Sequence, residues 1–339
     1  MEPSQKPWLS SKSCSPMHAP EIWERQDFWS RLAVATLTPL GWIYGASVAW
    51  KAHNAAPYHA PVPVICIGNL TVGGTGKTPV AIAIARALAA RGRRPFFLSR
   101  GYGGKLHGPI MVVPKHRAED VGDEPLLLAA AAPVIVSRNR AEGARLAVEH
   151  GADVIVMDDG HQNFTITKDL SLIVVDAEQK FGNGNILPAG PLRESASQGL
   201  ARADAVVVVG DGELPLPGFG GLVLRAHLTH VEIPALKGRR LVAFAGIGRP
   251  EKFFRSLHAF GADVAATKRF GDHHLYTVSE IARLKATARA ANALLVTTEK
   301  DYVRMTESER EGIVVLPVRA AIDNMSALEL LLDRLVGPR

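Results

Sequence analysis

Cysteine is scarce in this sequence, which contains only Cys14 and Cys66 among its 339 residues. Because Cys66 falls in an apolar run that predicts a buried strand, we expect no disulfide between them, and a reducing cytoplasm fits. The sequence contains no CxxC motif and no Cys/His cluster, which argues against a zinc site. No internal repeat stands out, which argues against a repeat architecture.

Acidic residues are absent from a long stretch: Phe28 to Ala118 contains no Asp or Glu, and the whole chain has a net charge of +6. A segment of one charge sign favours anionic partners such as a nucleotide, a lipid phosphate or an acidic membrane surface. A solvated basic face without a partner is the alternative. Nucleic acid is not expected, because the basic residues lack interleaved aromatics and no nucleic-acid motif is present.

The composition, 47% apolar and 21% charged, is that of a globular protein, and the length predicts two domains. Residues 1–20 are rich in Pro and Ser, and we expect them to be loose. Residues 61–210 alternate predicted strands and helices and form the first α/β domain. Residues 211–239 are rich in Gly and Pro and predict a linker that could be two-stranded. Residues 240–339 predict a smaller α/β domain.

Residues 21–60 are apolar, and Leu32–Trp50 carries no charge. Acidic residues precede this run, so a secretory signal is not expected. A full membrane span needs about 20 apolar residues, and Pro39 and Gly41 interrupt this one in the middle. The pattern therefore predicts helices that lie in a membrane interface, with packing on the core as the alternative. All five tryptophans lie in the first 50 residues, at Trp8, Trp23, Trp29, Trp42 and Trp50.

The strongest motif runs from Val64 to Thr78, with the sequence VICIGNLTVGGTGKT. Its apolar start, Val64–Ile67, predicts a buried strand, and the Ala-rich stretch Pro79–Ala90 predicts a helix. Strand, glycine-rich loop and helix form the layout of a phosphate-binding loop, in which backbone N–H groups and the helix dipole face phosphate oxygens. In that layout Lys77 reaches the β- and γ-phosphates, and the next hydroxyl ligates Mg²⁺.

This loop departs from the strict phosphate-binding pattern at one position, because Thr71 stands where the pattern has glycine. A glycine-rich turn without a ligand is the alternative, but the GKT triplet falls where a strand passes into a helix. We therefore expect the loop to bind a nucleotide. The residues expected to contact ATP are Thr71, Val72, Gly73, Gly74, Thr75, Gly76, Lys77 and Thr78.

A pair of carboxylates follows the apolar strand Val154–Met157, at Asp158 and Asp159. An apolar strand that ends in aspartate is typical of the segment that holds Mg²⁺ beside a phosphate-binding loop. Arg100 follows another predicted strand and precedes glycines, so it could face the same ligand, with an exposed turn as the alternative. Asp123 opens a helix, where a carboxylate could serve the helix dipole or accept a hydroxyl proton.

Two further stretches carry polar side chains without a strong signal of their own. Arg193 and Glu194 end the loop Leu187–Glu194, where they could clamp a phosphate and support a metal. Asp272, His273 and His274 are consecutive, and their spacing fits acid–base chemistry, metal binding or a pair of surface histidines equally well.

A set of motifs occurs in one order: IGNLTVGGTGKTP, SRGYGG, VGDEP, DDGHQN, LPAGPLRE, GDHHLY and TTEKD. With the tryptophan-rich N-terminus, this set closely resembles the tetraacyldisaccharide 4′-kinase family, the lipid A 4′-kinases of bacteria with an outer membrane. The resemblance covers roughly residues 21–335. The fold class expected is therefore α/β: a P-loop NTPase-like, mostly parallel sheet with helices on both faces, a smaller C-terminal α/β domain and an N-terminal membrane-interface helical segment.

The resemblance implies transfer of the ATP γ-phosphoryl group, with Mg²⁺, to the 4′-hydroxyl of a tetraacylated glucosamine disaccharide 1-phosphate at the cytoplasmic face of the inner membrane. By motif position, Asp123 resembles the catalytic base and His273 its partner, with His274 as the open alternative. The residues that resemble stabilisers of phosphate charge are Lys77, Arg100 and Arg193. The residues that resemble direct or outer ligands of the metal are Thr78, Asp158, Asp159, Gln162 and Glu194.

The sequence departs from the family at His161 and Asn163, where the family usually has Phe and His, which leaves the local packing open. The alternative function is a membrane-associated GTPase or ATPase switch. No Asn-Lys-x-Asp guanine motif is present, and Thr298–Asp301 is only distantly similar to one. A scaffold protein with a vestigial loop, the third possibility, would bind no ATP.

Overall fold

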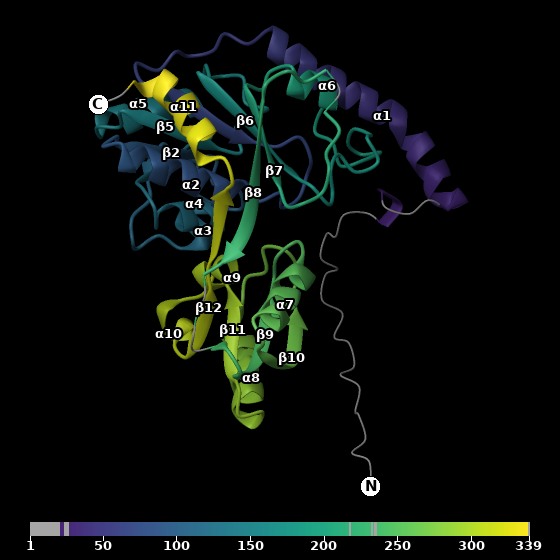
Figure 1. Ribbon diagram of the computed structural model, residues 1–339, viewed down its shortest axis with the longest axis vertical. Coiled ribbons are helices and arrows are strands. Elements are labelled where there is room, and N and C mark those ends of the chain that lie inside the picture. Colours follow the sequence, from purple (N-terminus) through teal and green to yellow (C-terminus); the bar gives the residue numbers. More distant parts are fainter. Residues whose placement is uncertain (1–20, 24–26, 217, 232, 234–235, 338–339) are drawn as a thin grey trace.

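The computed structural model describes residues 21–23, 27–216, 218–231, 233 and 236–337. The expected loose N-terminus, with Cys14, lies outside the described residues. The described chain forms two α/β units, one above the other in Figure 1. We call them the large unit and the small unit.

The large unit is built on a nine-stranded sheet with the order β13-β8-β7-β6-β1-β5-β2-β4-β3. Its strands from β8 to β4 are parallel, and the two edge strands, β13 and β3, are antiparallel to their neighbours. The bounds are β1 Val64–Gly68, β2 Pro95–Ser99, β3 Ile110–Met111, β4 Val134–Val136, β5 Val154–Asp158, β6 Leu170–Asp176, β7 Ala205–Val209, β8 Leu222–His230 and β13 Val318–Ile322. The mostly parallel sheet expected from the sequence is confirmed.

Helices cover both faces of this sheet, which explains why its strands are apolar throughout. Ile65 and Ile67 face the core under α2 and α11, whereas Val64 and Cys66 face the core under α5. Alternate residues of one strand therefore bury opposite faces. The helices of this unit are α2 Lys77–Ala90, α3 Ala118–Val121, α4 Asp123–Leu128, α5 Arg140–Glu149, α6 Ala196–Leu200 and α11 Met325–Val336.

The small unit contains a parallel four-stranded sheet with the order β10-β9-β11-β12. Its core lies between that sheet and α7 on one face and α8 on the other. The bounds are β9 Arg240–Ala245, α7 Pro250–Ala259, β10 Asp263–Arg269, α8 Val278–Ala290, β11 Leu294–Thr298, α9 Glu299–Val303, α10 Glu307–Arg310 and β12 Ile313–Leu316.

The last part of the chain differs from the expectation that residues 240–339 form the smaller domain. Strand β13 leaves the small unit and pairs with β8, and α11 then packs on the large unit (Figure 1). The reason is apolar burial, because Leu328 and Leu332 of α11 are buried in the core that also contains α2. Residues 222–230 of the expected linker likewise form the long strand β8, whose antiparallel partner comes from residues 318–322.

The N-terminal segment also differs from the expected pair of helices, because it forms one helix, α1, from Phe28 to His53. Pro39 lies inside this helix and removes only one backbone hydrogen bond from it. Gly41 and Gly45 do not break it but let it approach the large unit closely. A Cβ at Gly41 would lie 2.9 Å from the carbonyl oxygen of Ile186, and one at Gly45 would lie 2.8 Å from the Ile186 side chain.

Candidate active site

The glycine-rich loop ends where α2 begins, at the carboxyl end of β1. Gly76 precedes the helix with a φ of +86°, a conformation that a residue with a Cβ rarely adopts. The first two helical residues, Lys77 and Thr78, are buried, so their side chains point inward from the helix start. Strand β5 is the neighbour of β1, with Ile67 opposite Asp158. The sheet therefore brings the loop and the aspartate pair together.

Asp158 is the carboxylate that accepts from the loop hydroxyl. The Thr78 Oγ1 donates to Asp158 Oδ2 at 3.3 Å, while Oδ1 of the same carboxylate is buried and has no hydrogen-bond partner within the described residues. Burial, with the nearby charge of Glu124, raises the pKa of the Asp158 carboxyl. A buried carboxylate with an unpartnered oxygen beside a hydroxyl fits a hard cation such as Mg²⁺.

Asp159 is placed differently, although it is the next residue. It has a φ of +55° and pairs with the Lys77 Nζ at 3.4 Å and with the Arg193 Nη1 at 2.8 Å. Burial acts to raise the pKa of Asp159, but the charges of Lys77 and Arg193 outweigh it and hold that pKa below its usual range. Asp159 thus fixes two cationic side chains at the mouth of the phosphate-binding loop.

Gln162 and Glu194 extend this network outward. The Gln162 amide donates to Glu194 Oε1 at 2.9 Å and to the Asn69 carbonyl at 3.0 Å, and the buried Glu194 also pairs with Arg202. Their oxygens already have cationic or amide partners. Among the described residues, no group of three or more His, Cys, Asp or Glu side chains is arranged to hold a metal.

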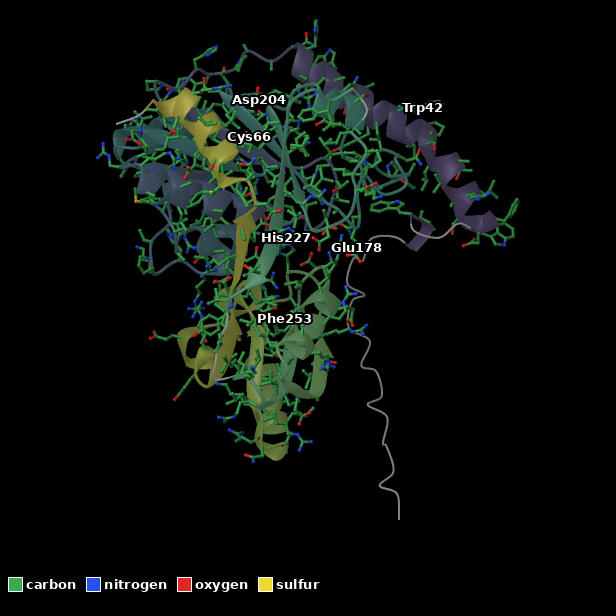
Figure 2. All side chains as sticks on the ribbon, viewed as in Figure 1. Trp42, Cys66, Glu178, Asp204, His227 and Phe253 are labelled. Carbon is green, nitrogen blue, oxygen red and sulfur yellow. The ribbon has the colours of Figure 1, made fainter. Side chains whose placement is uncertain are left out.

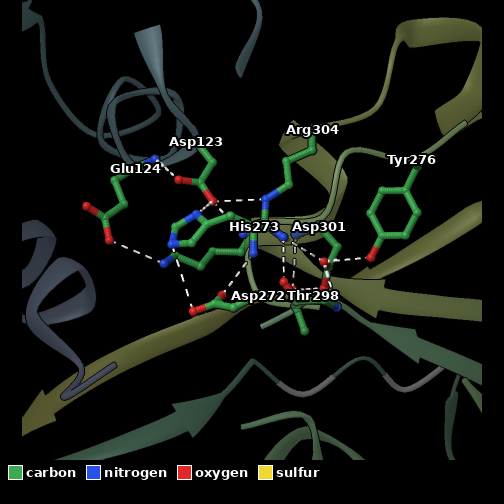
Figure 3. Close-up of polar contacts among 10 residues, drawn as sticks. Asp123, Glu124, Asp272, His273, Tyr276, Thr298, Asp301 and Arg304 are labelled. Carbon is green, nitrogen blue, oxygen red and sulfur yellow. Dashed lines mark hydrogen bonds and ion pairs between the residues drawn. The ribbon is translucent and has the colours of Figure 1, made fainter. Parts of the chain in front are cut away.

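The pair Asp123 and His273 joins the two units (Figure 3). His273 Nδ1 lies 3.0 Å from Asp123 Oδ2, across a gap of 150 residues in sequence. Burial acts to raise the pKa of Asp123, but the His273 hydrogen bond and the charges of Lys300 and Arg304 hold it well below the usual range. The open alternative, His274, instead bonds to Glu280 at 3.1 Å.

Sequence reasoning missed three basic residues around these carboxylates. Lys300 pairs with Glu124 at 3.2 Å, and the Arg304 Nε donates to Asp123 Oδ2 at 2.9 Å. Both residues belong to the segment that begins with the TTEKD motif. That motif was the only feature of the sequence that pointed to this segment.

The third missed residue, Arg140, begins α5 and is buried. Burial and the charge of Arg100 lower the pKa of Arg140 to about 10, and the charges of Asp159 and Asp158 also act on it. Arg100 itself is exposed just after β2. Among the described residues, the sequence-predicted basic groups therefore divide into Lys77 and Arg193, which contact Asp159, and Arg100, which does not.

The known proteins that this chain resembles belong to one family. The family model for Tetraacyldisaccharide-1-P 4′-kinase matches residues 33–336. The chain is 51% identical to the tetraacyldisaccharide 4′-kinase of Paramagnetospirillum magneticum, over 94% of this chain and 99% of that relative. It is 48% identical to that of Rhodospirillum rubrum, over 94% of this chain and 98% of the relative.

A solved structure also shares the fold. The LpxK protein of Aquifex aeolicus, crystallised in complex with ATP, superposes with a TM-score of 0.75 at 27% identity, covering 90% of this chain and 99% of that one. With the family model and the curated relatives, this leads to one conclusion: the chain belongs to the tetraacyldisaccharide 4′-kinase family.

Proposed function

We propose that this protein transfers the γ-phosphoryl group of ATP to the 4′-hydroxyl of a tetraacylated glucosamine disaccharide 1-phosphate, between the phosphate-binding loop and the Asp123–His273 pair. The observation that carries this assignment is the pairing of Asp123 with His273 across the two units. The charge of Glu124, the neighbour of Asp123, reaches Asp158 and contributes to its raised pKa. Helix α4, which begins with Asp123, and helix α2, which follows the loop, bury residues in the same core, so we place one ligand between the starts of these helices.

In this proposal the loop residues 71–78 hold the ATP phosphates through backbone N–H groups. Lys77 and Arg193, already oriented by Asp159, neutralise the charge that spreads over the transferred phosphoryl group. Thr78 and Asp158 would hold Mg²⁺, which would neutralise part of the negative charge of the phosphates. Asp159, Gln162 and Glu194 support that arrangement from outside.

Asp123 accepts the proton of the sugar hydroxyl as the oxygen attacks phosphorus, because a sugar hydroxyl is a poor nucleophile near pH 7. His273 stabilises the carboxylate and comes from the small unit, so the pair is complete only when the two units are in contact. This dependence on contact limits wasteful transfer to water.

We place the protein at the cytoplasmic face of the inner membrane, attached through α1. The support is the composition and exposure of that helix: it is long and apolar enough to cross a membrane, and only 17% of its most apolar window is buried. An acyl-chain-bearing acceptor stays in the membrane, so an interfacial helix brings the site to it.

The direct test supplies γ-labelled ATP and the tetraacylated disaccharide 1-phosphate and looks for a labelled bis-phosphorylated lipid. We expect this product from the protein and none from Lys77→Ala. The alternative, a P-loop switch, predicts hydrolysis without the lipid acceptor, and a guanine switch predicts preference for GTP. Either result without labelled lipid would overturn the proposal.

A further inference from the structure

A buried arginine connects the small unit to the proposed catalytic carboxylate. Arg304 follows α9, and its side chain is 1% exposed. Its Nε donates to Asp123 Oδ2 at 2.9 Å, and its Nη1 pairs with Asp301 Oδ1 at 3.0 Å. The guanidinium therefore lies between two carboxylates, one from each unit (Figure 3).

The small unit holds one side of this bridge without help from the large unit. Asp301 Oδ1 accepts from the Tyr276 hydroxyl at 2.7 Å and from the Gly246 N–H at 2.9 Å, and Asp301 Oδ2 accepts from the Thr298 hydroxyl at 2.6 Å. With Arg304, Asp301 has donors on both oxygens, so its orientation is fully determined. Thr298 and Asp301 are the first and last positions of the stretch TEKD in the TTEKD motif, to which the proposed function gives no role.

The other side of the bridge sets the orientation of Asp123. Its Oδ2 receives both Arg304 and His273 Nδ1, and its Oδ1 receives the Glu124 N–H at 2.9 Å. An arginine fork that engages one oxygen restricts rotation of the carboxylate. His273 can then approach that oxygen from the remaining side.

We propose that Arg304, held by Asp301, is a positioning residue for phosphoryl transfer that fixes the Asp123 carboxylate in the orientation His273 requires. The inference rests on the proposed function of Asp123. It gives the TTEKD motif a role: Thr298 orients Asp301, and Asp301 holds the guanidinium of Arg304 where it reaches Asp123 of the large unit.

The role proposed for Arg304 can be separated from a merely structural role in attaching the two units. A second contact between them pairs Arg249 with Asp176 at 3.3 Å and Lys252 with Asp176 at 3.0 Å, on more exposed side chains that include Glu178 (Figure 2). The ion pairs of this contact involve Asp176 and Glu178 and not Asp123, and they join the same two units. Arg249 therefore provides a matched control, because its loss weakens the attachment without touching Asp123.

The experiment compares Arg304→Gln, Arg304→Lys and Arg249→Gln by kcat, by KM for ATP and for the lipid acceptor, and by the pH profile of kcat/KM. Misplacing a catalytic group by about 1 Å can lower the rate on the order of 10²-fold. We expect Arg304→Gln to lower kcat by roughly 10–100-fold with the KM for ATP unchanged. The acidic limb of its profile should move to higher pH, because the Arg304 charge no longer lowers the pKa of Asp123. The other groups that face Asp123, Lys300 and His273, remain.

Arg304→Lys should recover part of the loss, because one ammonium keeps the charge but cannot bridge both carboxylates. Normal kcat and an unmoved acidic limb in Arg304→Gln would overturn the proposal, as would an equal loss in Arg249→Gln. If Arg304→Gln does not fold, the test rests on Arg304→Lys, and an unchanged kcat in that variant would overturn the proposal. Full turnover in Asp123→Ala would instead show that the role proposed for Asp123 is at fault, whatever Arg304 does.

Discussion

Asp123 is the single residue on which the proposed chemistry depends most. Its low pKa keeps it ionised at neutral pH, and it lies against His273 at the boundary of the units. Replacing Asp123 by Ala should lower kcat by about 10²–10⁴-fold, the usual contribution of a general base. ATP affinity should stay close to the original, because the loop residues that hold the phosphates are untouched.

The measurement is labelled-phosphate transfer together with ATP binding by calorimetry. Glu119→Gln is the control, since Glu119 is an exposed acid on the adjoining helix α3. The side chain of Glu119 pairs with Lys105 and not with the site. A kcat within twofold of the original in Asp123→Ala would remove it from the role.

His161 offers a prediction about stability and pH. It is 1% exposed, and its Nε2 donates to the Gly199 carbonyl at 3.1 Å while Nδ1 has no partner among the described residues. Burial, with the charges of Lys168 and Arg202, lowers the pKa of His161 to about 3. Between pH 6.5 and about 3 the unfolded chain therefore binds more protons at this residue than the folded one, so stability falls as the pH is lowered through that window.

The expected loss from this one histidine is about 2 kcal/mol between pH 7.5 and pH 5. His161→Phe has no such proton to bind and should show a smaller drop over the same range. Urea unfolding of both proteins at the two pH values measures the difference. An identical drop in the two proteins would show that His161 is not the group responsible.

At the scale of helices and strands, local signals predicted the elements that form the site. The run Val64–Thr78 predicted β1, the loop and the start of α2, and Val154–Met157 predicted β5, which ends at Asp158, with Asp159 next. In both places the apolar strand and the residues that follow it predict the same local structure, so tertiary packing did not have to override a local preference.

Elements held by distant partners were not predicted. Strand β13 is antiparallel to β8 across about 90 residues, and the Arg304–Asp123 bond spans 181 residues, so neither has a local signal. Helix α1 continues through Pro39, and its Gly41 lies against Ile186, a contact that the sequence does not reveal. Local signals thus predicted the site where one segment supplies it. Where the two units meet, only the family resemblance pointed to the Asp123–His273 pair, and nothing pointed to the contact between Arg304 and Asp123.

Helix α1 should bind membranes through its exposed apolar side chains, which can be followed along the helix in Figure 2. Trp42 is 68% exposed and Ile43 67% exposed, whereas the buried residues of this helix are Ser30, Gly41, Gly45 and Val48. Each large apolar side chain contributes about 1.5–3 kcal/mol when fully buried. The double change Trp42→Glu and Ile43→Glu should therefore weaken vesicle binding by at least about 10²-fold.

Sedimentation with phosphatidylethanolamine and phosphatidylglycerol vesicles measures this binding. Leu330→Glu is the control, because Leu330 is 61% exposed on α11, a helix of the large unit away from α1. Equal vesicle binding by the double variant and the original protein would exclude α1 as the attachment.

At the scale of the whole molecule, the small unit is an insertion between two paired strands. The chain leaves the large sheet at the end of β8 and returns at β13, where Val318 pairs with His230. Among the described residues, the core that contains β8, β13 and α11 includes none from the small unit. The large unit should therefore fold alone if residues 231–317 are replaced by a two-residue Asn-Gly turn, which suits antiparallel strands.

This shortened protein should unfold cooperatively and bind ATP, because the phosphate-binding loop, Asp158 and Asp159 all belong to the large unit. Transfer to the lipid should fall at least about 10³-fold, since His273 and Arg304 are gone and Asp123 is open to water. Calorimetry, ATP titration and labelled-lipid formation measure the three properties, and Lys77→Ala in the same background should remove ATP binding. Failure to fold would mean that the two units stabilise each other across their boundary, and undiminished transfer would mean that the chemistry lies entirely within the large unit.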